Sequence, residues 1–107
     1  TKDHSVVQEL VETGKITASE AKQHPNKNII TRALGVLPEI QIDFYEHPIG
    51  KDDVLLLCTD GLTNFVESEE ICKITESCSY YEFAENLVER ANDHGGGDNV
   101  TVVTIGF

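Results

Sequence analysis

Two aspartates stand at the ends of apolar runs, where a carboxylate can do chemistry. Asp60 comes two residues after Val54–Cys58, and Gly61 follows it directly. Five consecutive apolar residues predict a strand that is buried on both faces. A carboxylate at the tip of such a strand, beside a residue that tolerates any backbone angle, is well placed to bind a metal ion. The alternative is an Asp-Gly turn that merely ends a strand.

A second acid precedes another apolar run. Asp98 follows the three glycines 95–97, and Asn99 leads from it into the strand predicted over 100–105. If the two strands are antiparallel neighbours, the end of one lies beside the start of the other, and Asp60 meets Asp98. Hard divalent cations such as Mg²⁺ or Mn²⁺ prefer carboxylate and water oxygens. The pattern therefore predicts a small metal site at the edge of a sheet.

Histidine and cysteine patterns do not add to this site. The four histidines include His94, close to Asp98 in sequence, but none has a second histidine three or four residues away, so a histidine metal site is not expected. The three cysteines match neither a zinc site nor a disulfide framework. We expect them to be reduced and packed, with Cys58 acting as a small hydrophobic residue.

Capping patterns predict the helices that come before these strands. A helix is predicted over 1–13, with Ser5 as its N-cap, and Gly14 ends it. The sequence at 17–20 is a second capping box, and it begins a helix that cannot pass Pro25.

The remaining elements follow hydrophobic periodicity. Residues 40–45 alternate apolar and polar, which predicts a strand with one face on the core. Ser68 can cap a short helix, and Ser79 with Glu82 can cap a longer one. The longer helix carries an apolar stripe at 3.6-residue spacing, which comprises Tyr80, Phe83, Ala84, Leu87, Val88 and Ala91.

Such a set of elements cannot cover both faces of its own sheet. We therefore expect a large exposed apolar patch, and either docking on a further half of a domain or self-association.

Composition bounds the class of protein. The chain has 107 residues, of which 39% are hydrophobic, so it can form one domain at most and is not disordered by composition. A formal net charge of −11 argues against nucleic acid or an anionic membrane as the main partner. No apolar run can span a bilayer and no signal peptide is evident, so a cytoplasmic protein is expected. Residues 13–38 differ from the rest, with a local balance of +3.

Four motifs in order resemble one known family. They are Asp-His-Ser at 3–5, Asn-Ile-Ile-Thr-Arg-Ala-Leu-Gly at 28–35, Thr-Asp-Gly-Leu-Thr-Asn at 59–64 and Gly-Gly-Asp-Asn-Val-Thr at 96–101. Together they resemble the bacterial branch of the metal-dependent (type 2C) serine/threonine protein phosphatases. The resemblance covers residues 1–107, but it corresponds only to the C-terminal half of that family's catalytic domain. Its first-half motifs, a phosphate-binding arginine, a bridging Asp-Gly-x-Gly-Gly acid and a further aspartate, have no counterpart here, as expected of a fragment.

The resemblance implies a fold and a reaction. The fold is α/β, part of a four-layer α-β-β-α sandwich with mainly antiparallel sheets. The reaction is hydrolysis of phosphoserine or phosphothreonine in proteins by a water activated between two Mn²⁺ or Mg²⁺ ions. Asp60 and Asp98 would be ligands of one ion, with Gly61 and Asn99 shaping the strand ends. No other catalytic residue is implied in this half.

The resemblance also implies a flap beside the active site. Residues 14–38 correspond to it, and Lys22, Lys27 and Arg32 would lie on or beside it as candidates for substrate contact. The alternative is a solvated loop with ordinary surface charges. The implied partners are phosphoprotein substrates, including those of a serine/threonine kinase, and the N-terminal half of the same domain.

Two other functions remain open. The chain can be a non-catalytic acidic interaction module with a phosphatase-like fold. A small divalent-cation buffer is less well supported, because the chain lacks a contiguous calcium-binding loop. With two carboxylates only, this half alone is expected to bind metal weakly and to be inactive without the N-terminal half.

Overall fold

The computed structural model describes residues 1–107, and they form two compact units, Thr1–His47 and Pro48–Phe107. In each unit, helices begin at the capping patterns that the sequence contains.

The first unit contains two short helices with the predicted caps. Helix α1 spans Val6–Glu12, and its N-cap Ser5 is buried and accepts a hydrogen bond from the Gln8 amide at 3.3 Å. Gly14 lies beyond the helix with φ +72°, the left-handed geometry that commonly follows a helix end. The helix predicted over 1–13 is confirmed for 6–12 only, since residues 1–4 are not helical and Ser5 is the cap.

Helix α2 spans Ala18–Gln23 and begins with a complete capping box. The Thr17 amide donates to Glu20 Oε2 at 2.7 Å, and the Glu20 amide donates to Thr17 Oγ1 at 3.2 Å. The helix ends before Pro25, as predicted. Both helices are shorter than two full turns, so their caps satisfy a large share of the backbone donors that each helix leaves unpaired.

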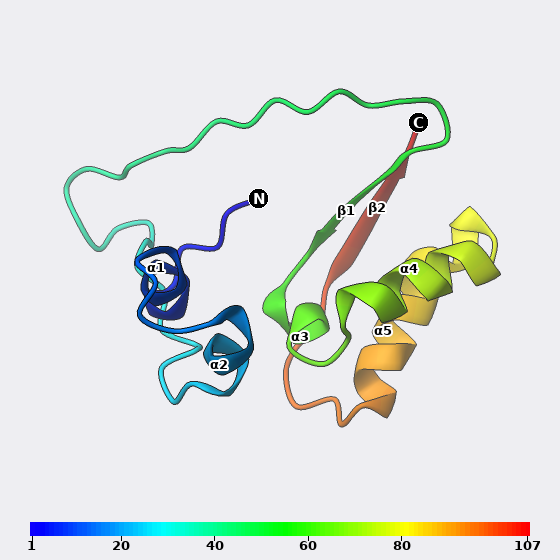
Figure 1. Cartoon of the computed structure of the whole chain (residues 1–107). Helices are drawn as coiled ribbons and strands as arrows, with labels where there is room; N and C mark the ends of the chain where they lie inside the picture. Colours follow the sequence, from blue (N-terminus) through cyan, green and yellow to red (C-terminus); the bar gives the residue numbers. More distant parts are fainter. The chain divides into compact units, whose positions relative to one another are not determined.

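The strand predicted over 40–45 is wrong. Residues 40–47 have no regular structure and run as an extended chain in Figure 1. The side chains of Ile42 and Phe44 are 65% and 89% exposed. A period-two pattern produces a strand only where a neighbouring strand supplies ladder hydrogen bonds, and this segment has none within its unit.

Asp43 ties this extended segment to the start of the chain. Its carboxylate lies 2.8 Å from His4 Nε2 and 3.1 Å from Arg32 Nη1. Arg32 also donates to the Gln41 carbonyl at 3.1 Å. These hydrogen bonds, from His4 first and Arg32 second, lower the pKa of the Asp43 carboxyl below its ordinary value.

The second unit is a two-stranded antiparallel sheet with helices. Strand β1 spans Val54–Cys58 and strand β2 spans Val102–Gly106, paired from Val54 opposite Gly106 to Cys58 opposite Val102. Between them lie, in order, α3 at Asp60–Thr63, α4 at Ser68–Ser77, the 3₁₀ turn η1 at Tyr80–Glu82 and α5 at Phe83–Asp93 (Figure 1). The predicted antiparallel pairing of these two strands is therefore confirmed.

The helix boundaries follow the sequence closely, with one shift. Glu67 rather than Ser68 is the N-cap of α4, and it makes no side-chain cap hydrogen bond. Ser79 and Glu82 form the predicted capping box, but it begins η1, from which the chain continues into α5.

The core of this unit lies between α3, α4 and α5. Leu62 and Leu87 are fully buried, and Val66 and Ala91 are 2% and 1% exposed. Phe83, Leu87 and Ala91 are the buried residues of α5, which confirms the predicted apolar stripe. Leu56 and Val102, one from each strand, pack against this core.

The other side chains of the strands are not covered. Leu55, Leu57 and Val103 are 43–50% exposed, so the prediction that the first strand is buried on both faces is wrong for this chain. Cys58 and Cys72 are exposed too, which corrects the expectation that the cysteines are packed, although all three are free. The apolar residues of a two-stranded sheet need a second layer, and the chain supplies one on a single face. The predicted exposed apolar surface is thus confirmed.

Tyr80 contacts the end of β2. Its hydroxyl donates to the Thr104 carbonyl and accepts from the Gly106 amide, both at 3.0 Å. A Cβ at Gly106 would lie 3.1 Å from the Tyr80 ring, so glycine allows this close contact. The hydroxyl thereby satisfies two backbone groups of one strand.

No helix in the structure has the length and apolar character needed to cross a membrane.

We expect Asp43→Asn to destabilise the protein at neutral pH, because it removes the charged partner of Arg32 and His4. Since the pKa of Asp43 is lowered in the folded state, its stabilisation is present above its unfolded-state pKa and is lost as the pH falls through its lowered folded-state value. Thermal unfolding of the wild type and the variant should therefore differ at pH 6 to 7, and the difference should begin to shrink below about pH 4. A gap in melting temperature that stays constant down to pH 3 would contradict this assignment.

Candidate metal centre

Asp60 does not end a strand in a simple turn but begins a helical turn. It is the first residue of α3, and Thr59 is the N-cap with φ −80° and ψ 164°. The Asp60 carbonyl accepts from the Asn64 amide at 2.9 Å, and its carboxylate accepts from Asn64 Nδ2 at 3.4 Å. The side chain remains exposed, on a short and well-hydrogen-bonded turn. This geometry holds the backbone of Asp60 while leaving its carboxylate open to solvent.

Asp98 lies in the loop between α5 and β2. Its Oδ1 accepts from the Asn99 amide at 2.7 Å, and the side chain is exposed. The preceding Gly95 and Gly96 have φ of +120° and +54°, angles that L-residues with side chains rarely adopt. The glycines therefore allow the loop to turn sharply before the acid.

The two loops are joined by close backbone contact. The Thr59 amide donates to the Thr101 carbonyl at 3.1 Å, and the Thr101 amide donates to Thr59 Oγ1 at 3.0 Å. A Cβ placed on the buried Gly61 would lie only 2.0 Å from the Asn99 carbonyl oxygen. Gly61, next to Asp60, thus packs directly on Asn99, next to Asp98. The structure therefore brings together the two segments that the sequence predicted to meet.

The donors present are of the kind that a hard divalent cation uses. Asp60 and Asp98 offer exposed carboxylate oxygens on neighbouring backbone segments. No group of three or more histidine, cysteine, aspartate or glutamate side chains has the geometry of a metal site anywhere in the chain. Two carboxylates leave most of an octahedral shell to water, a common arrangement for Mg²⁺. These two residues could therefore supply some of the ligands of a metal ion, but they do not form a complete metal site by themselves.

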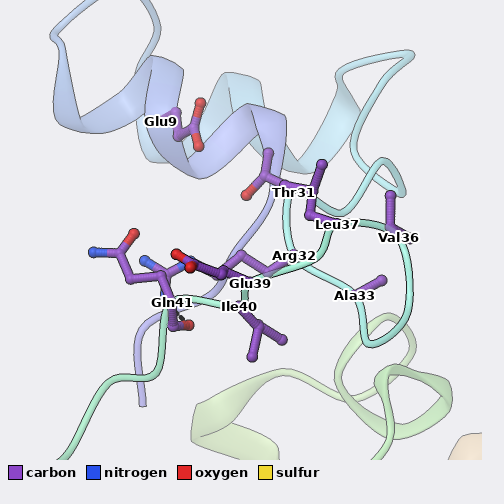
Figure 2. Close-up of a pocket in the computed structure, with 9 residues that line it drawn as sticks. All are labelled: Glu9, Thr31, Arg32, Ala33, Val36, Leu37, Glu39, Ile40 and Gln41. Carbon is purple, nitrogen blue, oxygen red and sulfur yellow. Dashed lines mark hydrogen bonds between the residues drawn. The ribbon is translucent and has the colours of Figure 1, made fainter.

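The basic residues assigned to a flap belong to the first unit. Lys22 lies in the last turn of α2, and Lys27 lies in the turn that follows. Arg32 is only partly exposed, because its guanidinium pairs with Asp43 and Gln41. Figure 2 shows Arg32 among the residues that line a pocket of about 340 Å³. Its apolar wall comprises Ala33, Val36, Leu37 and Ile40.

Sequence reasoning missed the residues that join the two loops. Thr59 uses both its amide and its hydroxyl on Thr101, and Phe65 contacts the glycine loop. The position of Thr59 before Asp60 suggests a helix cap, but its hydroxyl makes no cap hydrogen bond and accepts from the Thr101 amide instead. Phe65 carried no comparable signal, since an aromatic residue after a short helix usually indicates only core packing.

The chain is similar to known proteins along most of its length. The family model of stage II sporulation protein E (SpoIIE) matches residues 15–107. The chain belongs to the type 2C family of metal-dependent protein phosphatases. It is 46% identical to the serine/threonine phosphatase stp of Listeria monocytogenes, an alignment that covers 98% of this chain and 42% of that protein.

Solved structures of the type 2C family show the same arrangement. The serine/threonine phosphatase Stp1 of Staphylococcus aureus superposes with a TM-score of 0.94 at 36% identity, covering 100% of this chain and 42% of that one. The catalytic domain of PstP, crystallised with two manganese ions, superposes with a TM-score of 0.76 at 40% identity, covering 97% and 42%.

These matches confirm the predicted family and its α/β sandwich fold. The chain spans less than half the length of these relatives and matches their C-terminal part.

We expect Gly61→Ala to disrupt the junction between the two loops. The added Cβ would overlap a backbone carbonyl, which cannot move as a side chain can. The free energy of unfolding, measured by urea titration, should fall by about 3 kcal/mol. Gly50→Ala is the matched control, since a Cβ at Gly50 would meet its nearest atom at 3.4 Å. That control should change stability by less than about 0.5 kcal/mol, and an equally small effect at Gly61 would contradict the close contact.

Proposed function

We propose that this chain forms part of a metal-dependent protein phosphatase that hydrolyses phosphoserine and phosphothreonine. The observation that carries the proposal is the contact of Gly61 with the Asn99 backbone, which joins the segments of Asp60 and Asp98. Family membership and the manganese-bound PstP structure support it.

The proposal assigns a role to each site residue. Asp60 and Asp98 hold one of two Mn²⁺ or Mg²⁺ ions, and Gly61 and Asn99 keep the two acids at fixed separation. When bound, the ions lower the pKa of a shared water and neutralise charge on the phosphoryl group. The two carboxylates would orient that centre. The bridging acid and the phosphate-binding arginine come from residues outside 1–107.

The proposal also extends to organisation and partners. Residues 1–107 form the C-terminal half of a catalytic domain, with 14–38 as its flap. The exposed apolar face of β1 and β2 is then covered by the N-terminal half or by a second copy. The substrates are phosphoproteins, among them targets of a serine/threonine kinase, and the site of action is the cytoplasm.

The ligand assignment can be tested by removing one charge at a time. Asp60→Asn and Asp98→Asn in the complete gene product should each lower Mn²⁺-dependent hydrolysis of an aryl phosphate on the order of 100-fold, because each removes an anionic ligand. Asp93→Asn, an exposed acid on α5, is the matched control and should keep full activity. Full activity in both site variants would refute the assignment.

One observation favours a second function. The chain lacks a third acidic or histidine ligand near the pair, and it carries a net charge of −11. Both features suit a non-catalytic acidic interaction module with a phosphatase-like fold. Hydrolysis that is absent from the complete gene product in the presence of Mn²⁺ would favour this alternative.

The basic flap offers a separate test. We expect Lys22→Glu with Lys27→Glu to lower phosphopeptide kcat/KM about threefold or more at low salt, because the local positive charge attracts an anionic substrate. The effect should fade as added salt shortens the screening length from about 30 Å at 0.01 M to about 3 Å at 1 M. Lys51→Glu with Lys73→Glu, which makes the same total charge change at exposed residues outside 13–38, is the control. Turnover that the double variant leaves unaltered at low salt would exclude this role.

A further inference from the structure

Phe65 touches the glycine loop at two points. His94 Nδ1 lies 2.7 Å from the Phe65 carbonyl oxygen. Because a carbonyl oxygen only accepts, Nδ1 carries the proton and donates it. A Cβ on Gly97 would lie 2.9 Å from Phe65 Cζ, so the Phe65 ring packs against this glycine. One residue thus contacts both the residue before the loop and the residue next to Asp98.

Phe65 itself stands on the turn that carries Asp60. Its amide donates to the Leu62 carbonyl at 3.1 Å, and the next amide, that of Val66, donates to the same carbonyl at 2.9 Å. Leu62 and Val66 are in the buried core, at 0% and 2% exposure. The Phe65 backbone is therefore fixed relative to α3, whose first residue is Asp60.

The start of the glycine loop is also tied to the end of α5, because the Gly95 amide donates to the Asn92 carbonyl at 3.1 Å and the Gly96 amide donates to the Ala91 carbonyl at 3.2 Å. A Cβ at Gly95 would meet no atom within 4 Å, so this residue lies in open space. Glycines lose more conformational freedom on ordering than any other residue, so a further contact beyond Gly96 helps to fix Gly97 and the Asp98 that follows it. The loop is held at its start by His94, which caps α5 with its amide on Arg90, and at its end by the Gly97 contact. Asn92 packs against Gly96, and the contacts of His94 and Gly97 are both with Phe65.

A third group supports His94 from the other side. Glu70 Oε1, on α4, lies 3.7 Å from His94 Nε2 and 3.3 Å from Arg90 Nε. The imidazole is therefore placed between a backbone carbonyl and a carboxylate. This arrangement orients the ring and keeps Nδ1 directed at Phe65.

We propose that Phe65 and His94 are positioning residues that hold the 95–97 loop, and with it Asp98, at the distance from Asp60 that one cation requires. The inference rests on the proposed function, because it takes the two aspartates as ligands. Neither residue touches the metal. They act by reducing the number of positions that Asp98 can take before an ion binds.

The first test compares two substitutions of His94 in the complete gene product. His94→Leu removes the donor to Phe65, whereas His94→Asn keeps an amide donor near the place of Nδ1. Mn²⁺ binding by calorimetry, followed at the site that Asp98→Asn abolishes, should weaken about tenfold or more in the leucine variant. The asparagine variant should stay within about threefold of wild type. Circular dichroism of the metal-free proteins confirms that both variants are folded at the temperature of the titration.

A second pair of variants tests the contact with Gly97. Gly97→Ala should also weaken Mn²⁺ binding, because its Cβ collides with the Phe65 ring. Adding Phe65→Leu shortens the opposing side chain and should recover part of the lost affinity. A purely structural role would lower the stability of the metal-free protein and leave the Mn²⁺ affinity of the folded form unchanged, and the double variant would not recover it.

The outcomes separate the two proposals. If Asp60→Asn and Asp98→Asn abolish a Mn²⁺ site while folded His94→Leu and Gly97→Ala bind Mn²⁺ as wild type does, the positioning role is overturned and the proposed function stands. If neither aspartate variant changes Mn²⁺ binding, the proposed function fails and the positioning role fails with it. Selective loss in His94→Leu with recovery in His94→Asn supports both.

Discussion

The structure of the second unit depends on a contact that only glycine permits. Gly61 packs on the Asn99 carbonyl so closely that no side-chain carbon fits between them. The approach draws the turn after β1 against the loop before β2, and the hydrogen bonds of Thr59 with Thr101 extend the pairing of the strands beyond their ends. Two acids distant in sequence thereby share one edge without any direct bond between them. Covalent geometry and packing, rather than charge, bring them there.

This contact also explains why the carboxylates remain exposed. Packing a turn against a loop buries Gly61 and Leu62, while the neighbouring Asp60 faces solvent. An ionised side chain avoids the large desolvation cost of burial in this way. The supporting core lies one layer below, in α4 and α5, where Leu87 and Ala91 are almost fully buried. The exposed carboxylates are thus carried by segments that pack on the apolar core.

The sequence correctly predicted the features of the fold that depend on residues close together along the chain. The capping boxes at Thr17 and Ser79 and the stripe of α5 are local, because each is set within one or two turns of helix. The segment 40–45 was predicted wrongly, since a strand exists only with a hydrogen-bonding neighbour that the alternating pattern does not specify. The burial of β1 was overestimated for a related reason, because a second covering layer cannot be inferred from five apolar residues. Within the candidate site, the two acids could be predicted from strand ends, but the support from Phe65 could not, because it depends on a carbonyl and a ring meeting residues far along the chain.

The tyrosine at the end of β2 makes the two borders of the sheet unequal. An edge strand offers unpaired amides and carbonyls to which another strand can add. Tyr80 already occupies the Thr104 carbonyl and the Gly106 amide, so an incoming strand meets a phenol ring there instead of free backbone. A further strand can therefore pair more readily with the free edge of β1 than with the edge of β2. A single hydroxyl thus makes the two edges of the sheet different in their capacity to pair with a further strand.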